Sequence, residues 1–192
     1  TMGIDYETAV QEFMWNVPET YSITSVIASH AEAFGDRLAV QYLNEEGERA
    51  ERTYADLRDD AHRFANALED LGVGKGDRVM HLFPRHPDAF AIQLGVLAVG
   101  ALLVPCSSML RPKDIAFRAT DCAAQTIIVH ESLTDMVEPI VADTPIERVI
   151  NLDGDGDEHP SFAALIDGQP TTYDGPELAA EDPMSINYTS GT

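Results

Sequence analysis

Three hydroxyl side chains and a glycine end the sequence, in the run Thr189-Ser190-Gly191-Thr192. Before them, Met184 to Tyr188 alternates apolar with smaller or polar residues, which predicts a half-buried strand. Hydroxyls and free backbone N–H groups after a strand can bind phosphate oxygens, and Gly191 allows close approach of the backbone. We therefore predict that Thr189, Ser190, Gly191 and Thr192 form part of a phosphate-binding loop, of which this sequence supplies about half.

Two other pairs of residues could contact a ligand, although each also has an ordinary structural interpretation. His81 and His86 lie near the end of an apolar run, where they could line a pocket or simply pack. Arg111 and Lys113 flank the start of an expected helix, where they could meet an anion or extend into solvent. For both pairs the structural interpretation is favoured.

Two loops invite a ligand-binding interpretation that their spacing does not support. The sequence "GVGKGD" at Gly72–Asp77 fits neither common nucleotide-loop pattern, and it precedes a strand where phosphate loops follow one. The acidic run at Asp153–Asp157 suggests calcium, but the twelfth position, where a calcium loop requires Glu, is Ala164. We interpret the first as a structural turn and the second as a solvated acidic loop.

The composition excludes several classes of function. The 192 residues are 44% hydrophobic, enough for a domain with a real core, and they contain 33 acidic but only 12 basic residues. The resulting net charge of −21 argues against a basic face for nucleic acid and against adhesion to an anionic membrane. The most apolar segment, Ala89 to Val104, is shorter than the roughly 20 residues of a spanning helix. The acidic N-terminal residues do not resemble a secretory signal, so we expect a cytoplasmic protein.

The acidic residues have three possible explanations. Their spread along the whole chain argues against an acidic tail. An acidic surface for a basic partner remains possible, as does a surface adapted to high salt, where counter-ions screen the repulsion. The scarcity of lysine, with only Lys75 and Lys113 present, favours the high-salt (halophilic) explanation. Cys106 and Cys122 fit two reduced residues rather than a disulfide framework or a zinc site.

The first half of the chain predicts a helix, a hairpin and a second helix. The first helix opens at Ser22 and stops at Gly35, and residues 38–43 and 49–54 then form a β-hairpin around a short turn. The clearest helix begins after Thr53, whose side chain can form a capping box with Asp56.

The later segments alternate between strands and helices. Because the expected strands are apolar runs, they indicate a mainly parallel sheet covered by helices on both faces, hence an α/β fold. We expect a lead segment (1–20), an α/β sheet subdomain (21–152) and an acidic connection with a strand that enters the truncated loop (153–192). The expected strands are 78–83, 102–104, 126–129 and 148–152; the expected helices run from Pro87 to about Val99, from Pro112, from Ser132 and from Phe162 to Ile166.

This order of elements resembles the N-terminal part of the adenylate-forming enzymes, which include acyl-CoA synthetases, aryl-CoA ligases, peptide-synthetase adenylation domains and luciferases. Tyr188–Thr192 matches the first five positions of their loop Y-T-S-G-T-T-G-x-P-K-G. The stretches "TYADL" at Thr53–Leu57, "LGVGKGDRV" at Leu71–Val79 and Gly95–Val129 are similar to earlier family motifs. The resemblance covers nearly all of the chain after Tyr21, and "SSMLRPKDIAFR" is most similar to the medium-chain or acetyl-type acyl-CoA synthetases.

The resemblance implies a two-step reaction. ATP and a carboxylate give an acyl-adenylate and pyrophosphate, and coenzyme A then takes the acyl group. It implies ATP, Mg²⁺ and coenzyme A for the intact enzyme, a small short- or medium-chain carboxylate as substrate, and a place in fatty acid metabolism. It also implies that Thr189, Ser190 and Thr192 donate hydrogen bonds to the ATP phosphates. We interpret Tyr188 as a strand residue that positions the loop rather than as a ligand.

The sequence departs from the family pattern where the chemistry would be completed. The loop lacks its second half with the lysine, and the adenine pocket, magnesium-binding acid, most of the acyl pocket and catalytic lysine would follow later. Some relatives place arginines for coenzyme A after the strand equivalent to Thr126–Val129, but "HESLTDM" contains none, so no coenzyme A contact is assigned. We therefore expect no catalytic residue, no firmly held cofactor and no activity in this part alone. The alternatives are a non-catalytic nucleotide-binding or interaction module and an acidic scaffold without ligand.

Overall fold

The computed structural model describes residues 10, 18–154, 156 and 158–189. Among the elements described here, helix α2 (Ile23–Phe34) is followed by the antiparallel hairpin of β1 (Leu38–Leu43) and β2 (Arg49–Thr53). The predicted N-terminal hairpin is therefore confirmed. The remaining elements are α3 (Tyr54–Asp70), β3 (Arg78–Leu82), α4 (Ala89–Ala98), β4 (Leu102–Cys106), α5 (Pro112–Asp121), β5 (Thr126–Val129), α6 (Thr134–Val141), β6 (Arg148–Asn151) and α7 (Phe162–Ile166).

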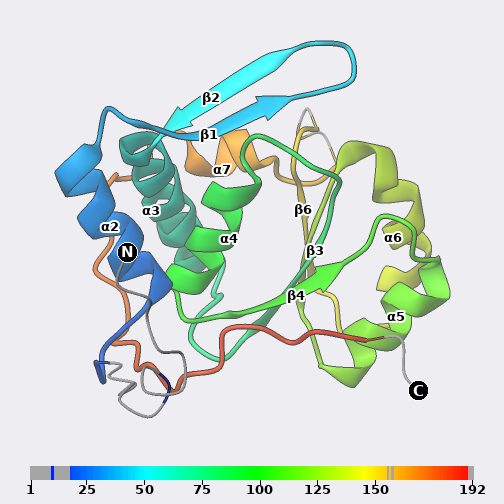
Figure 1. Cartoon of the computed structure of the whole chain (residues 1–192). Helices are drawn as coiled ribbons and strands as arrows, with labels where there is room; N and C mark the ends of the chain where they lie inside the picture. Colours follow the sequence, from blue (N-terminus) through cyan, green and yellow to red (C-terminus); the bar gives the residue numbers. More distant parts are fainter. Residues whose placement is uncertain (1–9, 11–17, 155, 157, 190–192) are drawn as a thin grey trace.

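A parallel sheet of four strands in the order β4-β3-β5-β6 forms the centre of the described molecule. Helices α3 and α4 cover one face and α5 and α6 the other, with α2 outside α3 and α4 (Figure 1). The chain goes from β3 to β4 on one side and then returns to β5 on the other side of β3. This reversal places the topological switch point between β3 and β5, where the carboxyl ends of such sheets commonly bind ligands.

Two hydrophobic clusters fill the spaces between the sheet and its helices. Adjacent residues of a strand point to opposite faces, so Val79 enters the cluster under α3 and α4 while Met80 enters the one under α5 and α6. In β5, Ile127 and Ile128 divide between the clusters in the same way. Because both faces are covered, the strands are apolar runs, and the predicted two-sided parallel sheet is confirmed.

The helix starts agree with the predicted capping residues. The Ser22 hydroxyl accepts a hydrogen bond from the Ser25 N–H at the start of α2. At the start of α3, the Thr53 hydroxyl accepts from the Asp56 N–H, and the Asp56 carboxylate accepts from the Thr53 N–H at 2.8 Å. The Thr53 backbone and hydroxyl donors hold the pKa of Asp56 below its usual value. Both caps satisfy N–H groups that the first turn leaves without a helical partner.

Two local predictions need correction near β5 and β4. The helix expected from Ser132 begins at Thr134, because Glu131–Leu133 forms a 3₁₀ turn. The strand expected at residues 102–104 continues to Cys106 and includes Pro105. A proline is tolerated there because β4 is the edge of the four-stranded sheet and its missing N–H faces outward.

The strand predicted for Met184–Tyr188 is reduced to one parallel bridge between Ser185 and Leu103. The Leu103 N–H donates to the Met184 carbonyl at 3.0 Å, and the Ile186 N–H donates to the Leu103 carbonyl at 2.8 Å. The next donor on β4 facing this segment would be the N–H of Pro105, which proline lacks. The pairing therefore stops after one step, and the segment lies beside β4 without forming a full strand.

Candidate functional site

The connection between α7 and the end of the chain is attached to α3. The Asn66 side-chain amide donates to the carbonyls of Pro170 and Thr172 at 3.1 and 3.0 Å. The Tyr173 hydroxyl donates to the Glu69 carboxylate at 2.8 Å, and burial, together with this bond, raises the pKa of Tyr173 well above its usual value. These side-chain hydrogen bonds thus hold the first part of the connection against α3.

Lys75 holds the next part of the connection. Its ammonium donates to the Asp182 carboxylate at 2.7 Å and to the Glu177 carbonyl at 3.0 Å. Asp182 also accepts from the Ala179 N–H at 2.8 Å, which closes a local turn. The loop that carries Lys75 is a turn between α3 and β3, as expected, and its lysine binds the connection.

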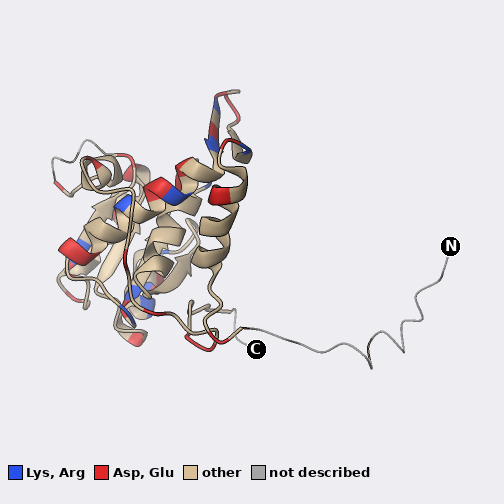
Figure 2. Ribbon diagram, turned by 90° about the vertical axis from the view of Figure 1, so that its left-hand side faces the viewer, with Lys and Arg blue, Asp and Glu red and all other residues tan. Residues whose placement is uncertain are grey.

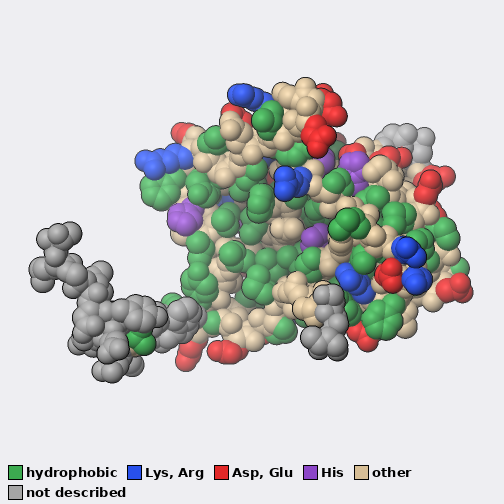
Figure 3. All heavy atoms as spheres, turned by 45° about the vertical axis from the view of Figure 1, so that its right-hand side comes forward, with side chains coloured by type: hydrophobic (Ala, Val, Ile, Leu, Met, Phe, Trp, Pro, Cys, Tyr) green, Lys and Arg blue, Asp and Glu red, His purple; other side chains and the backbone are tan. Residues whose placement is uncertain are grey.

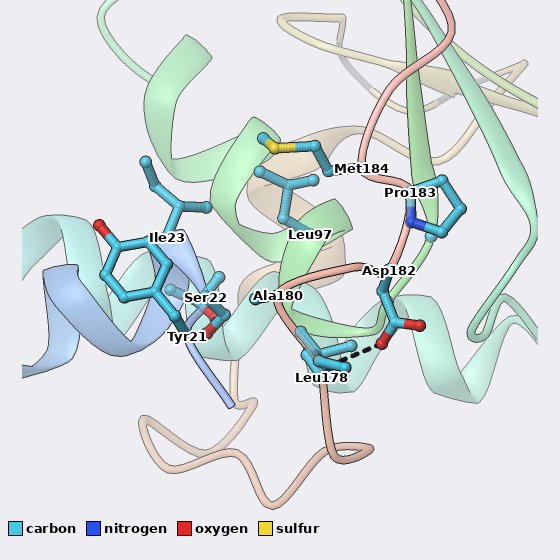
Figure 4. A pocket seen from close by; sticks show the side chains of 13 residues that line it. Tyr21, Ser22, Ile23, Leu97, Leu178, Ala180, Asp182, Pro183 and Met184 are labelled. Atoms are coloured by element: carbon cyan, nitrogen blue, oxygen red, sulfur yellow. Dashed lines mark hydrogen bonds between the residues drawn. The ribbon is translucent and has the colours of Figure 1, made fainter. Parts of the chain in front are cut away.

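An apolar cavity of about 250 Å³ lies between the start of α2, the end of α4 and the connection. Figure 4 shows side chains from all three elements around it, among them Ile23, Leu97 and Met184. Among the described residues, Asp182 is its only charged lining residue, and that carboxylate is paired with Lys75. The described lining therefore offers apolar contacts and no cationic group for a phosphate.

The connection then runs beside β4, the edge strand of the sheet, before it reaches Tyr188 and Thr189. Because Ser185 pairs with Leu103 in the parallel sense, the chain at this bridge runs in the same direction as β4, towards the carboxyl ends of the strands. Tyr188 is half-buried and its hydroxyl donates to Asp121 on α5 at 2.7 Å, whereas Thr189 is exposed. The predicted loop thus follows a segment that runs parallel to β4, towards the edge at which α/β sheets usually bind ligands.

The four predicted phosphate-binding residues are only partly covered by the structure. Thr189 is described, whereas Ser190, Gly191 and Thr192 lie outside the described residues. Their contact with phosphate therefore stays a prediction.

Sequence reasoning missed a polar cluster at the switch point itself. The rings of His86, after β3, and His130, after β5, lie 6.3 Å apart between centroids. His130 Nε2 is 3.1 Å from an Asp153 carboxylate oxygen, and Arg52 pairs with Asp88 at 2.5 Å. Each of these residues except Arg52 follows a predicted strand, so the rule that strand ends meet at one edge could have identified the group.

The internal pairing of this cluster limits what it can bind. Burial lowers the pKa of His86, although Asp88 and Asp153 oppose the shift. Within the described ranges, no group of three or more His, Cys, Asp or Glu side chains is arranged to hold a metal ion. The Arg52–Asp88 ion pair joins the hairpin to the loop after β3, and the contacts of His130 with the His86 ring and with Asp153 join that loop to the loops after β5 and β6. The contacts of His86 are thus structural ones within the described residues.

The other residues considered as ligand contacts also have structural explanations. His81 is buried in β3, and its Nε2 has no hydrogen-bond partner among the described residues. Burial lowers the pKa of His81 to about 4, so its ring is neutral at pH 7 and cannot attract an anion by charge. Arg111 and Lys113 are both exposed at the start of α5, as surface residues would be.

The chain is similar to known ligases over most of its length. The sequence profile of the AMP-binding enzyme family matches residues 27–192. The 3-hydroxybenzoate/4-hydroxybenzoate–CoA ligase of Thauera aromatica is 33% identical over 147 residues, covering 73% of this chain and 27% of that protein. The acetyl-coenzyme A synthetase of Streptomyces coelicolor is 31% identical over 182 residues, covering 85% of this chain and 28% of that protein.

A solved structure supports the same assignment. The anthranilate CoA ligase AuaEII, crystallised with anthranoyl-AMP, matches with a TM-score of 0.81 at 26% identity, over 91% of this chain and 32% of that one. This likeness confirms the α/β fold as the first part of a larger adenylate-forming domain. The chain spans less than a third of the length of the relatives named here. Since the family profile covers all but the first residues, the chain belongs to the AMP-binding enzyme family, the adenylate-forming superfamily of acyl-CoA synthetases.

Proposed function

We propose that this chain is the N-terminal part of an ATP-dependent acyl-CoA synthetase that forms an acyl-adenylate and then a coenzyme A thioester. The observation that carries the proposal is the parallel course beside β4 of the segment that leads into the Y-T-S-G-T loop, in a chain of this family. Within the whole protein we propose the same division as from the sequence: a lead segment (1–20), the sheet subdomain (21–152) and the connection into the loop (153–192).

The loop would act on the phosphates of ATP. When a carboxylate attacks the α-phosphate in line, pyrophosphate leaves and negative charge grows on the β- and γ-phosphate oxygens. Hydroxyls of Thr189, Ser190 and Thr192 donate hydrogen bonds to these oxygens, and Gly191 lets the backbone approach them. Fixed donors of this kind stabilise the leaving group without reorganising during the reaction.

Groups from outside this chain would complete the site. Mg²⁺ and coenzyme A belong to the proposed reaction, but the described residues contain no cluster of three metal-ligating side chains. The segment after β5 in which some relatives place arginines for coenzyme A reads "HESLTDM" and contains none, so we assign neither cofactor a ligand in this chain. Exposed apolar side chains, including Met109 (88% exposed) and Phe117 (63%), support further chain packing against this part.

The substrate is proposed to be a short- or medium-chain carboxylic acid, in fatty acid metabolism. The likeness to an acetyl-coenzyme A synthetase supports a short chain, whereas the likeness to a hydroxybenzoate–CoA ligase makes an aromatic acid the second candidate. We further propose that the protein acts in the cytoplasm. In the part of the chain that is described, no helix is long and apolar enough to cross a membrane.

Exchange of labelled pyrophosphate into ATP tests the proposed function. We expect the protein from the complete coding sequence to catalyse exchange that depends on a carboxylate, with a panel of acetate, butyrate, octanoate, benzoate and 4-hydroxybenzoate ranking the acids. The 192-residue chain should show none. ATP binding without exchange by the complete protein would instead favour the alternative, a non-catalytic nucleotide-binding or interaction module.

The same assay tests the loop hydroxyls. In the complete protein, Thr189→Ala or Ser190→Ala should lower kcat/KM for ATP by roughly 10- to 100-fold, because each removes a hydrogen bond to a charged group. Stability should change little, since Thr189 is exposed. Thr172→Ala, another exposed threonine in the connection, is the matched control. A loss of folded protein without a separate kinetic defect would contradict the role proposed for these hydroxyls.

The acidic surface is proposed to be an adaptation to high salt. Figure 2 shows Asp and Glu on several helices and loops rather than on one face, and Figure 3 shows them mostly around a hydrophobic centre. Screening of the net charge of −21 should therefore stabilise the fold as salt rises from 0.1 to 1 M. A gain of about 1 kcal/mol would raise Tm by roughly 2–4 °C. An unchanged Tm across this range would refute the adaptation.

A further inference from the structure

Tyr188 is held on the surface of α5 by three different side chains. Its hydroxyl donates to the Asp121 carboxylate at 2.7 Å. The Arg118 guanidinium carbon lies 5.0 Å from the centre of the Tyr188 ring, and the Phe117 ring meets it edge to face at 6.4 Å between centroids. One phenol thus combines a charge-assisted hydrogen bond, a cation–π contact and an aromatic contact.

The partner of Tyr188 occupies a position that helix electrostatics disfavours. Asp121 is the last residue of α5, where the helix dipole presents partial negative charge. A hydrogen-bond donor from another part of the chain stabilises a carboxylate at this position, and the Tyr188 hydroxyl supplies that hydrogen bond. Burial and the bond to Asp121 raise the pKa of Tyr188 well above its usual value, so the hydroxyl remains a neutral donor at physiological pH.

Among the described residues, Tyr188 also makes the last contacts that hold the chain before the loop. The backbone bonds of the segment to Leu103 end at Ile186, because Pro105 cannot continue them. Beyond Ile186, the side-chain contacts of Tyr188 with α5 hold the chain, and the exposed Thr189 follows directly. The direction in which the loop leaves the sheet edge therefore depends on this side chain.

We propose that Tyr188, held by Asp121, is a positioning residue that fixes the start of the phosphate-binding loop for ATP. The inference rests on the proposed function, because it takes the loop to bind ATP phosphates. Tyr188 need not touch the nucleotide; it acts through the backbone position of Thr189. Removing its hydroxyl should weaken the productive binding of ATP and leave the binding of the carboxylate unchanged.

The chain offers a close chemical control for this idea. Tyr173 also donates its hydroxyl to a helix carboxylate, Glu69 on α3, at 2.8 Å. It lies in the same connection, fifteen residues earlier in the sequence, and its ring packs against the hydrophobic cluster under α3 and α4. Tyr173→Phe therefore removes the same kind of hydrogen bond and leaves the contacts between Tyr188 and α5 unchanged.

The experiment compares steady-state kinetics of the complete protein carrying Tyr188→Phe, Tyr173→Phe, Asp121→Ala or Asp121→Asn. Tyr188→Phe and Asp121→Ala should each raise KM for ATP by about five- to tenfold, the effect of one lost hydrogen bond, with KM for the carboxylate unchanged. Asp121→Asn keeps an acceptor oxygen and should restore most of the ATP affinity. The double variant Tyr188→Phe/Asp121→Ala should be no worse than either single change, because both remove one interaction.

Equal kinetic effects of Tyr188→Phe and Tyr173→Phe would overturn the inference, as would equal increases in KM for ATP and for the carboxylate. Either result would mean that the hydroxyl merely stabilises the fold. Pyrophosphate exchange by the wild-type protein shows whether the further inference or the proposed function has failed. If it shows no carboxylate-dependent exchange, the synthetase assignment itself is wrong.

Discussion

Replacement of Gly95 by valine is expected to lower the free energy of unfolding of the chain by about 3 kcal/mol, at the upper end of the usual cost of overpacking. Gly95 lies in α4 where this helix crosses α3. A Cβ at this position would lie 2.9 Å from Cδ1 of Phe64 and 3.0 Å from the Ala61 carbonyl oxygen. The carbonyl belongs to the backbone of α3 and cannot rotate away, so the two helices must separate. Urea unfolding followed by circular dichroism measures the loss.

Gly74→Ala is the control for this prediction. Gly74 lies in the turn before β3, and an added Cβ there would meet no atom within 4 Å. We expect a change within about 0.5 kcal/mol, as for most surface substitutions. If Gly95→Val costs no more than Gly74→Ala, the close approach of α3 and α4 is not the reason for the glycine.

The packing role of Gly95 could not be predicted from the sequence. In the sequence it interrupts an apolar segment, which argues against a membrane span but does not say what lies opposite. The capping residues Ser22 and Thr53 were predictable because a cap acts within four residues of itself. Gly95 faces Phe64, 31 positions earlier in the sequence, and only the packing of two helices brings them together.

The same distinction applies to the sheet and its edge. The two-sided parallel sheet was predictable, since apolar runs between helices are typical of strands buried on both faces. The single bridge at Ser185 was not, because it depends on Pro105 lying beside a segment about 80 residues later in the sequence. An alternating pattern predicts a strand, but only the neighbour decides whether the ladder can continue.

The candidate site likewise contains residues that the sequence identifies and contacts that it does not. The hydroxyl run was recognisable from residue types and from the family motif, and the structure adds where Thr189 emerges. The cluster of His86, His130 and Asp153 gathers residues from three loops. No local pattern connects these residues, although the rule that strand ends meet at one edge of a sheet does. The attachment of Tyr188 to α5 likewise spans 67 positions of the sequence.

Acidification from pH 7 to pH 4 is expected to remove about 3 kcal/mol of stability through His81, from 1.36 kcal/mol per pKa unit. Burial lowers the pKa of His81 from 6.5 to about 4. Between these values the unfolded chain binds a proton that the folded chain does not. The contribution of His81 to the free energy of unfolding is therefore fully present above pH 6.5 and decreases as the pH falls towards 4. Below pH 4, His81 causes no further loss of stability.

Other groups titrate over the same range, so the measurement is a difference between variants. The free energy of unfolding from urea titrations at pH 7 and pH 4 should fall by about 3 kcal/mol more for the wild type than for His81→Leu, which has no ring to protonate. Met80→Leu changes the adjacent buried residue of β3, on the opposite face, without altering any titratable group. It should retain the wild-type dependence on pH. If His81→Leu loses as much stability on acidification as the wild type does, the buried imidazole is not the group that makes this fold sensitive to acid.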